Sequence, residues 1–141
     1  MFSKASEYGI RAVLYICSES NGGKKTTINE IYEHVEAPRH FTAKVLQKLS
    51  RAKLISSTKG VNGGFYLTSE QSKNSLFQIV NAIDGDALFT ECGLGLKYCS
   101  ATEPCPLHDQ FMSIRTNLKK MMTGTSIQNM AVKIKSGKIL T

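Results

Sequence analysis

The chain has 141 residues, a length that suits one core-forming domain with an appended helix and argues against a multidomain enzyme. Its 18 lysines and arginines outnumber its 11 aspartates and glutamates, and the net charge of +7 favours an anionic partner, either nucleic acid or a membrane surface. No apolar run reaches the roughly 18 residues of a spanning helix, and the amino terminus lacks the apolar stretch of a signal peptide, so we expect a cytoplasmic protein with no membrane partner.

The amino-terminal segment predicts two helices separated by a glycine-containing loop. Residues 3–19 carry apolar side chains at helical spacing, and Cys17 near the end of this helix is expected to be a small buried hydrophobe. Glu7 lies in the first turn, where a carboxylate interacts favourably with the helix dipole. Thr27 and Glu30 form a capping-box pattern, which predicts a short second helix with the apolar residues Ile28, Ile31, Tyr32 and Val35.

A third helix, beginning at Pro38, combines an apolar stripe with a basic one. The apolar stripe consists of Phe41, Val45, Leu46 and Leu49, and the basic stripe of Lys44, Lys48 and Arg51. Residues 54–59 and 65–68 then predict two short strands, joined by a glycine-rich turn at 60–64. From residue 37 to residue 69 there are six lysines or arginines and no acidic residue. Helix, hairpin and charge together predict a winged helix-turn-helix that binds DNA, although a solvated basic helix would show the same charge.

This geometry nominates a set of DNA contacts. The start of the third helix is expected to reach base edges, through Arg39, His40, Thr42, Ala43 and Lys44. Lys48 and Arg51 are expected nearer the phosphates, and Lys59 and Asn62 are expected to be wing contacts. His40 could equally be an ordinary surface histidine.

The rest of the chain predicts two further helices on either side of a long loop. After a polar linker at 70–74, a fourth helix is marked by Leu76, Ile79, Val80 and Ile83 and ends at Asp84-Gly-Asp86. The loop at 88–106 precedes a helix with the heptad pattern Leu107, Phe111, Ile114, Leu118 and Met121. This seam favours a homodimer, because a small DNA-binding protein usually needs two copies to recognise its site; the alternative is packing on the chain's own core. After Gly124 comes a short apolar pattern, Ile127, Met130, Ala131 and Ile134, followed by a basic end expected to be loosely held.

These elements predict a mainly α-helical fold with one small β-hairpin. We expect a winged helix-turn-helix domain at residues 1–86, a cysteine-rich loop at 87–106, and a dimerisation helix with a tail at 107–141.

The cysteine-rich loop predicts an inorganic site. Cys92, Cys99, Cys105 and His108 occur with the spacing C-x6-C-x5-C-x2-H. Three thiolates and an imidazole can hold a tetrahedral zinc or an iron–sulfur cluster, and spacing alone does not decide between them. In a reducing compartment a disulfide framework is the less typical use of cysteine, and unligated or redox thiols are the remaining alternative.

Nearly the whole chain resembles the Rrf-two family of bacterial winged-helix regulators. The resemblance rests on Tyr8-Gly-Ile-Arg11, on Lys59-Gly-Val-Asn-Gly-Gly-Phe65, on the helix at 76–83 and on the three-cysteine loop. It implies a homodimer that binds palindromic promoter DNA and carries an iron–sulfur cluster near the dimer interface, with Cys92, Cys99 and Cys105 as ligands.

The resemblance implies two candidates for the fourth ligand. His108 matches the IscR-like pattern and favours a 2Fe-2S cluster, whereas Glu7 stands where NsrR-like relatives carry an acidic ligand from the other subunit and is compatible with a 4Fe-4S cluster.

The sequence therefore predicts a transcription regulator, most often a repressor in this family, whose operator affinity depends on a cluster that senses nitric oxide, redox state or cluster supply. The alternative is a constitutive DNA-binding regulator with structural zinc or a metal-free cysteine loop. The sequence has no motif or residue grouping that points to catalysis, and we expect no enzyme.

Overall fold

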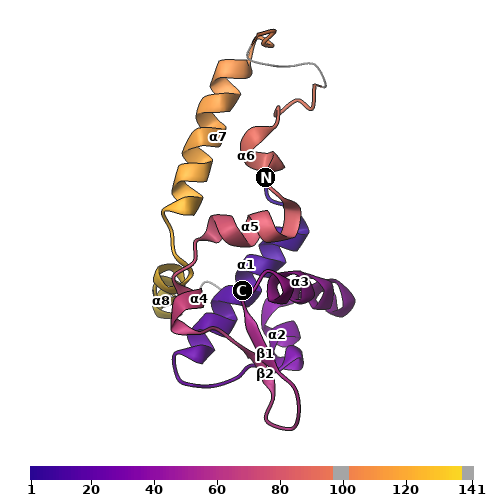
Figure 1. The fold of residues 1–141 in the computed structure, drawn as a ribbon, viewed down its shortest axis with the longest axis vertical. Coiled ribbons are helices and arrows are strands. Elements are labelled where there is room, and N and C mark those ends of the chain that lie inside the picture. Colours follow the sequence, from indigo (N-terminus) through magenta and orange to yellow (C-terminus); the bar gives the residue numbers. More distant parts are fainter. Residues whose placement is uncertain (97–101, 138–141) are drawn as a thin grey trace.

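The computed structural model describes residues 1–96 and 102–137, the last three by their backbone alone. Helix α1 (Lys4–Ser20) is the central element, with α2, α3, α5 and α8 packed around it (Figure 1). It begins where the Ser3 hydroxyl accepts a hydrogen bond from the backbone N–H of Ser6 at 3.0 Å. Its buried side includes Ala12, Val13, Leu14, Ile16 and Cys17. The predictions of a first helix and of a buried Cys17 are both confirmed.

Helices α2 (Ile28–Val35) and α3 (Arg39–Arg51) form the helix-turn-helix pair. The Thr27 hydroxyl accepts a hydrogen bond from the backbone of Glu30 at the start of α2. Glu36 ends α2 in the left-handed region, with a φ of 54°, and Pro38 directly precedes α3. The apolar stripe of α3 faces the core through Val45, Leu46 and Leu49, as predicted.

The wing consists of the antiparallel strands β1 (Ser56–Thr58) and β2 (Gly64–Tyr66), in the register Ser56 opposite Tyr66. Both strands are shorter than expected, because the flanking residues Leu54, Ile55 and Leu67 are buried in the core instead of extending the hairpin. A bridge at Thr26 supports β2: its N–H and carbonyl each form a 2.8 Å hydrogen bond with Phe65. This contact between distant segments holds the base of the wing against the helix-turn-helix.

Two short helices occupy segments expected to be irregular. Residues 69–72 form α4 (Ser69–Ser72), started by a capping box between Thr68 and Gln71, where a polar linker was expected. Within the expected loop lies α6 (Ala87–Thr90), because Phe89 is buried and packs edge-to-face on Phe77 with ring centroids 5.0 Å apart. The predicted fourth helix, α5 (Leu76–Asp84), is confirmed; it is capped by Ser75 and Gln78 and ends at Gly85.

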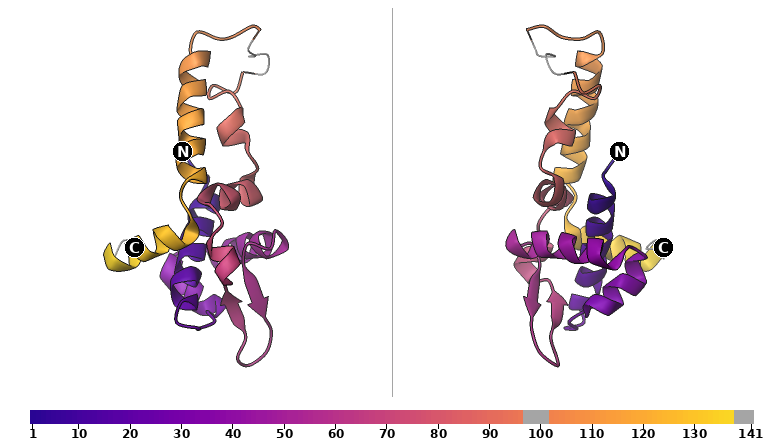
Figure 2. Two further views of the ribbon diagram at one scale, coloured as in Figure 1. Left: turned by 60° about the vertical axis from the view of Figure 1, so that its left-hand side comes forward. Right: turned by 90° about the vertical axis from the view of Figure 1, so that its right-hand side faces the viewer.

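Helix α7 (His108–Thr123) extends away from the winged unit with α6 beside it, so that the described ends of the cysteine loop and the wing lie at opposite ends of the structure (Figures 1 and 2). The chain then returns through α8 (Ile127–Gly137), which packs on α1. Its residues Ile127, Ala131 and Ile134 are buried, and the N–H of Ile127 donates to the Asn74 carbonyl at 2.9 Å. The apolar pattern after Gly124 thus belongs to the core of the winged unit. The basic end from residue 138 lies outside the described residues. In the described parts, no helix is long and apolar enough to cross a membrane.

Candidate nucleic-acid interface and cysteine loop

Helix α3 presents one exposed face opposite its buried one. Residues on an α-helix advance by about 100° each, so the buried positions 42, 45, 46 and 49 define one side and the positions 40, 43, 44, 47 and 51 the other. His40, Lys44, Gln47 and Arg51 are exposed, and Ala43 is half-buried. The exposed face therefore carries cations and polar groups but no carboxylate.

Thr42 does not belong to this face, and its predicted base contact is wrong. The residue is 0% exposed, and its hydroxyl is buried without a hydrogen-bond partner. Thr42 lies one turn before Val45 and Leu46, so helical spacing already placed it on the apolar side. Gln47 is the opposite case, since it lies on the exposed face and was not predicted as a contact.

Lys48 is also placed differently from the prediction. Its ammonium group donates a 3.1 Å hydrogen bond to the carbonyl of Ile83, in the last turn of α5. The positive charge thus meets the negative end of a helix dipole and satisfies a carbonyl that has no partner within its own helix. In this conformation Lys48 links α3 to α5 through one of its three ammonium N–H donors.

The remaining predicted contacts lie at the surface of α3 and the wing. Lys59 and Asn62 are exposed in the turn of the wing. The Arg39 guanidinium lies 5.4 Å from the centre of the Tyr32 ring, a cation–π contact that holds it against α2. Between α3 and the wing runs a groove of about 400 Å³ lined by Ile28, Ala43, Leu46, Gln47, Ser50, Arg51, Ser57 and Phe65. Helix and wing therefore form one continuous surface.

Both described ends of the cysteine loop contact α7. Cys105 accepts a 3.0 Å backbone hydrogen bond from His108, which places the two residues in one turn. The other end is fastened further along α7, where Arg115 donates to the Glu91 carbonyl at 2.5 Å. A methyl group at Gly93 would lie 2.5 Å from the Phe111 ring, so the chain beside Cys92 touches α7 directly.

The side chains of Cys92, Cys105 and His108 are half-buried. Cys99, the middle predicted ligand, lies outside the described residues. Within residues 1–96 and 102–137, no three potential metal ligands are already grouped. The donor types still suit a soft metal centre, because two of the predicted thiol ligands and the imidazole lie at the two loop ends that α7 holds.

Glu7 lies away from this loop. Its carboxylate pairs with Lys4 at 3.1 Å in the first turn of α1. The amino-terminal end of α1 lies near α5 and α6, whereas the described ends of the cysteine loop lie at the far end of α7 (Figures 1 and 2). Of the two candidate fourth ligands, His108 is the one that shares a turn with a described cysteine of the same chain, Cys105.

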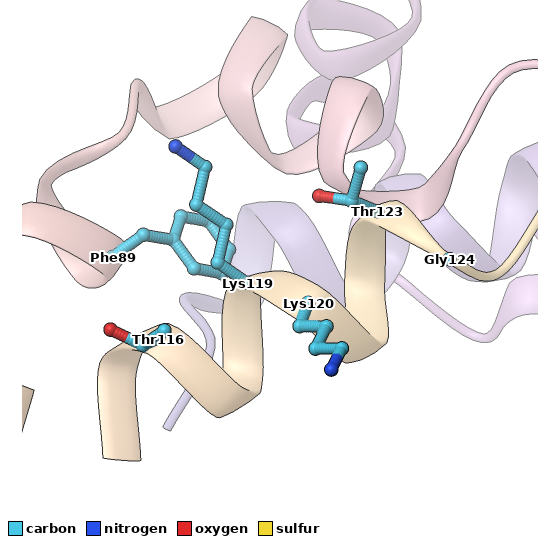
Figure 3. Close-up of a pocket in the computed structure, with 6 residues that line it drawn as sticks. All are labelled: Phe89, Thr116, Lys119, Lys120, Thr123 and Gly124. Carbon is cyan, nitrogen blue, oxygen red and sulfur yellow. The ribbon is translucent and has the colours of Figure 1, made fainter. Parts of the chain in front are cut away.

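A separate hollow of about 580 Å³ lies between α6 and α7. Figure 3 shows Phe89 and Lys119 at this hollow, which is also lined by Thr116, Lys120, Thr123 and Gly124. Lys119 lies 5.2 Å from the centre of the Phe77 ring. The lining has no carboxylate, imidazole or thiol, so it does not offer an acid–base pair for catalysis.

The fold combines a helix-turn-helix and a wing with a cationic exposed helix face and a long projecting helix. These features are those of a winged helix-turn-helix transcription regulator. The family model of Rrf2 (the Rrf-two family), described as "Iron-dependent Transcriptional regulator", matches residues 2–133. The chain belongs to this family. Rrf2 regulators bind DNA and typically form dimers, so the protein is a DNA-binding regulator of transcription and not an enzyme.

Two relatives match over most of their length. A protein of Aquifex aeolicus, named as an HTH-type transcriptional regulator, is 28% identical over 92% of this chain and 90% of its own. Protein aau3 of Rhizobium meliloti is 27% identical over 91% of this chain and 82% of its own.

Solved structures share the fold. CymR, the global cysteine regulator of B. subtilis, has a TM-score of 0.76 at 20% identity, covering 94% of this chain and 97% of its own. T. potens IscR has a TM-score of 0.76 at 15% identity, covering 99% of this chain and 91% of its own. An oxidized form of Staphylococcus aureus CymR has a TM-score of 0.71 at 19% identity, covering 93% and 95%. These likenesses support the mainly helical winged fold predicted from the sequence.

Proposed function

We propose that this protein is a homodimeric regulator, acting as a repressor, whose affinity for a palindromic promoter site is controlled by an iron–sulfur cluster held in the cysteine loop. The observation that carries the proposal is that both described ends of the cysteine loop contact the amino-terminal half of α7. The same helix, with the residue before it, exposes an apolar strip formed by Leu107, Ile114 and Met121. A group bound there would brace the dimerisation helix, and α7 joins directly to the winged unit.

DNA binding is supported by the common surface of α3 and the wing. His40, Lys44 and Arg51 lie on the exposed face of α3, and Lys59 and Asn62 on the wing. DNA carries about one negative charge per ~1.7 Å of axis, and lysines and arginines that neutralise phosphates release condensed counterions. A helix with no carboxylate on its exposed face meets no repulsion as it approaches that charge.

Dimerisation is supported by the predicted heptad seam of α7, in which some residues contact the chain itself and others are exposed. Phe111 packs on Gly93 and Leu118 packs on the core, so these residues are used within the chain. Leu107, Ile114 and Met121, spaced by seven residues, are 41%, 56% and 57% exposed. An exposed apolar strip of this kind on a projecting helix is suited to a second copy of the same helix.

Cluster binding is proposed for Cys92, Cys99 and Cys105, with His108 as fourth ligand and a 2Fe-2S cluster as the favoured form. His108 is preferred because it shares a turn with Cys105, whereas Glu7 would have to come from the partner subunit. Such a cluster supplies electron transfer and reactivity toward nitric oxide and oxidants. The chain's residues supply the ligands, and the Gly93–Phe111 and Glu91–Arg115 contacts attach them to α7.

A path of direct contacts runs from the loop to the DNA-binding helix. Phe89 of α6 packs edge-to-face on Phe77 of α5, and a carbonyl at the end of α5 accepts a hydrogen bond from the Lys48 ammonium of α3. Loosening α6 and α7 would therefore change the support of α5 and of α3. Coupling between two sites typically amounts to a 5- to 150-fold change in affinity.

The decisive experiment is anaerobic purification with iron and sulfide assays, followed by binding to a selected DNA site with and without the cluster. We expect a coloured protein, loss of the visible absorbance in Cys105→Ala and His108→Ala, and retention of it in Cys17→Ala, whose thiol is buried in the core. Glu7→Ala should leave the spectrum unchanged. A colourless, iron-free protein whose DNA affinity is the same in Cys105→Ala would refute cluster control.

A second candidate is suggested by the likeness to CymR, named a global cysteine regulator. A metal-free regulator, or one with structural zinc, would keep the DNA-binding surface but not the cluster. Zinc analysis of the colourless protein would separate these two cases.

A further inference from the structure

One residue on the exposed face of α3 is neither basic nor at the helix start. Gln47 lies between Lys44 and Arg51, on the side opposite the buried Val45 and Leu49. Its side chain is exposed and lines the groove between α3 and the wing. It therefore lies at the centre of the surface that the proposed function assigns to DNA.

The amide of Gln47 makes no side-chain hydrogen bond within the described parts of the chain. Other glutamines serve the fold: Gln71 and Gln78 close capping boxes, and Gln128 accepts a hydrogen bond from Ser72 at 3.2 Å. No contact among the described residues accounts for an amide at position 47. Its donor and acceptor remain available to a ligand.

The neighbours of Gln47 leave it room. One turn earlier stands Ala43, whose methyl group covers little of the surface, and Ser57 lines the wing side of the groove. Lys44 and Arg51 flank it on the same face, where they can fix the helix on the phosphates. Phosphate contacts position a protein on DNA, whereas contacts with base edges determine which sequence is bound.

The chemistry of the side chain selects a partner. A primary amide offers one N–H donor and one carbonyl acceptor side by side, which matches the N7 acceptor and N6 amino group that adenine presents in the major groove. A phosphate offers acceptors only and would leave the amide carbonyl without a partner. We infer that Gln47 is a specificity-determining residue that forms a bidentate contact with an adenine in each half-site. This inference rests on the proposed DNA binding.

The test is selection of binding sites from a random DNA library by the full-length dimer, carried out in parallel for the wild type and for variants at position 47. Wild-type protein should select an adenine at one position of each half-site. Gln47→Ala should lose the preference at that position alone, by about 5- to 150-fold per half-site, while its salt dependence stays the same. Gln47→Glu should shift the preference toward cytosine, whose amino group a carboxylate accepts from.

Ser50→Ala, which changes another lining residue of the same groove, is the matched control and should leave the selected sequence unchanged. Thermal unfolding of Gln47→Ala should match wild type, because the side chain is exposed. The inference is overturned if Gln47→Ala keeps the full base preference, or if it weakens all sequences equally as a phosphate contact would. Wild-type protein that selects no sequence and shows no salt-dependent binding would instead overturn the proposed DNA-binding function itself.

Discussion

Lys44 and Lys48, one turn apart on α3, should differ in what they do. Replacing either with methionine keeps most of the aliphatic stem and removes the ammonium group. Lys44 is exposed and makes no side-chain hydrogen bond or ion pair within the described residues, whereas Lys48 donates to the Ile83 carbonyl at 3.1 Å. We expect Lys48→Met to lower stability and Lys44→Met to lower DNA affinity.

The size of the stability effect follows from the geometry. A hydrogen bond with a charged donor contributes about 1.5–3 kcal/mol when shielded, and a cation at a helix carboxyl terminus about 0.3–1 kcal/mol. Lys48 is exposed, so water and salt screen both contributions, and we expect a loss of about 0.5–1.5 kcal/mol in the free energy of unfolding. Urea unfolding at one fixed protein concentration measures it, since dimerisation contributes to apparent stability.

The DNA effect is measured from the dependence of affinity on salt. Each lost phosphate contact reduces the slope by about 0.9, so Lys44→Met in both subunits of a dimer should reduce it by nearly two. Lys48→Met should leave the slope within about half a unit of wild type. If Lys48→Met reduces the slope as much as Lys44→Met and leaves urea unfolding unchanged, the assignment of Lys48 to α5 is refuted.

Three further results are expected. Ile114→Asp should shift the dimer toward monomer in sedimentation, because it places a charge in the exposed apolar strip. Thr116→Asp, an exposed position on the opposite side of the same helix, should leave the dimer intact. An intact dimer in Ile114→Asp would place the interface elsewhere. Gly63→Ala should weaken DNA binding, because the added methyl group would collide with the Thr58 carbonyl and displace the turn of the wing. Fluorescence anisotropy measures the affinity, and an affinity equal to that of the wild type would mean that the wing does not contact DNA. Burial raises the pKa of the Cys17 thiol, so iodoacetamide at pH 8 should modify this thiol only after denaturation. Mass spectrometry follows the labelling, and rapid labelling of the folded protein would contradict the burial of Cys17.

Local sequence signals were sufficient for most of the winged unit. The helix starts at Ser3 and Thr27 depend on hydrogen bonds between residues three apart, so they can be predicted without the tertiary structure. The apolar periodicity of α5 predicted its buried face correctly, and that of α3 predicted Val45, Leu46 and Leu49, because burial of one face is what stabilises a short helix. The exposed positions of Lys44 and Arg51 followed from the same periodicity.

The signals failed where a residue's partner lies far along the chain. Lys48 and Ile83 are 35 positions apart, and only the packing of α3 beside α5 brings the ammonium group to that carbonyl. The heptad seam was visible in the sequence. The sequence did not show which seam residues face inward. Phe111 and Leu118 do so because they contact Gly93 and the core, whereas Ile114 faces outward.

The sequence by itself thus determined the helices α1, α2, α3, α5 and α7, the hairpin and the basic exposed face of α3, because each depends on residue chemistry and short-range spacing. Tertiary structure alone decided that Lys48 supports a neighbouring helix, that α8 returns to cover α1, and that both described ends of the cysteine loop are attached to α7. These outcomes depend on contacts between segments that are distant in the sequence. Periodicity shows which side of a helix must be covered, but it does not show which segment of the chain covers it.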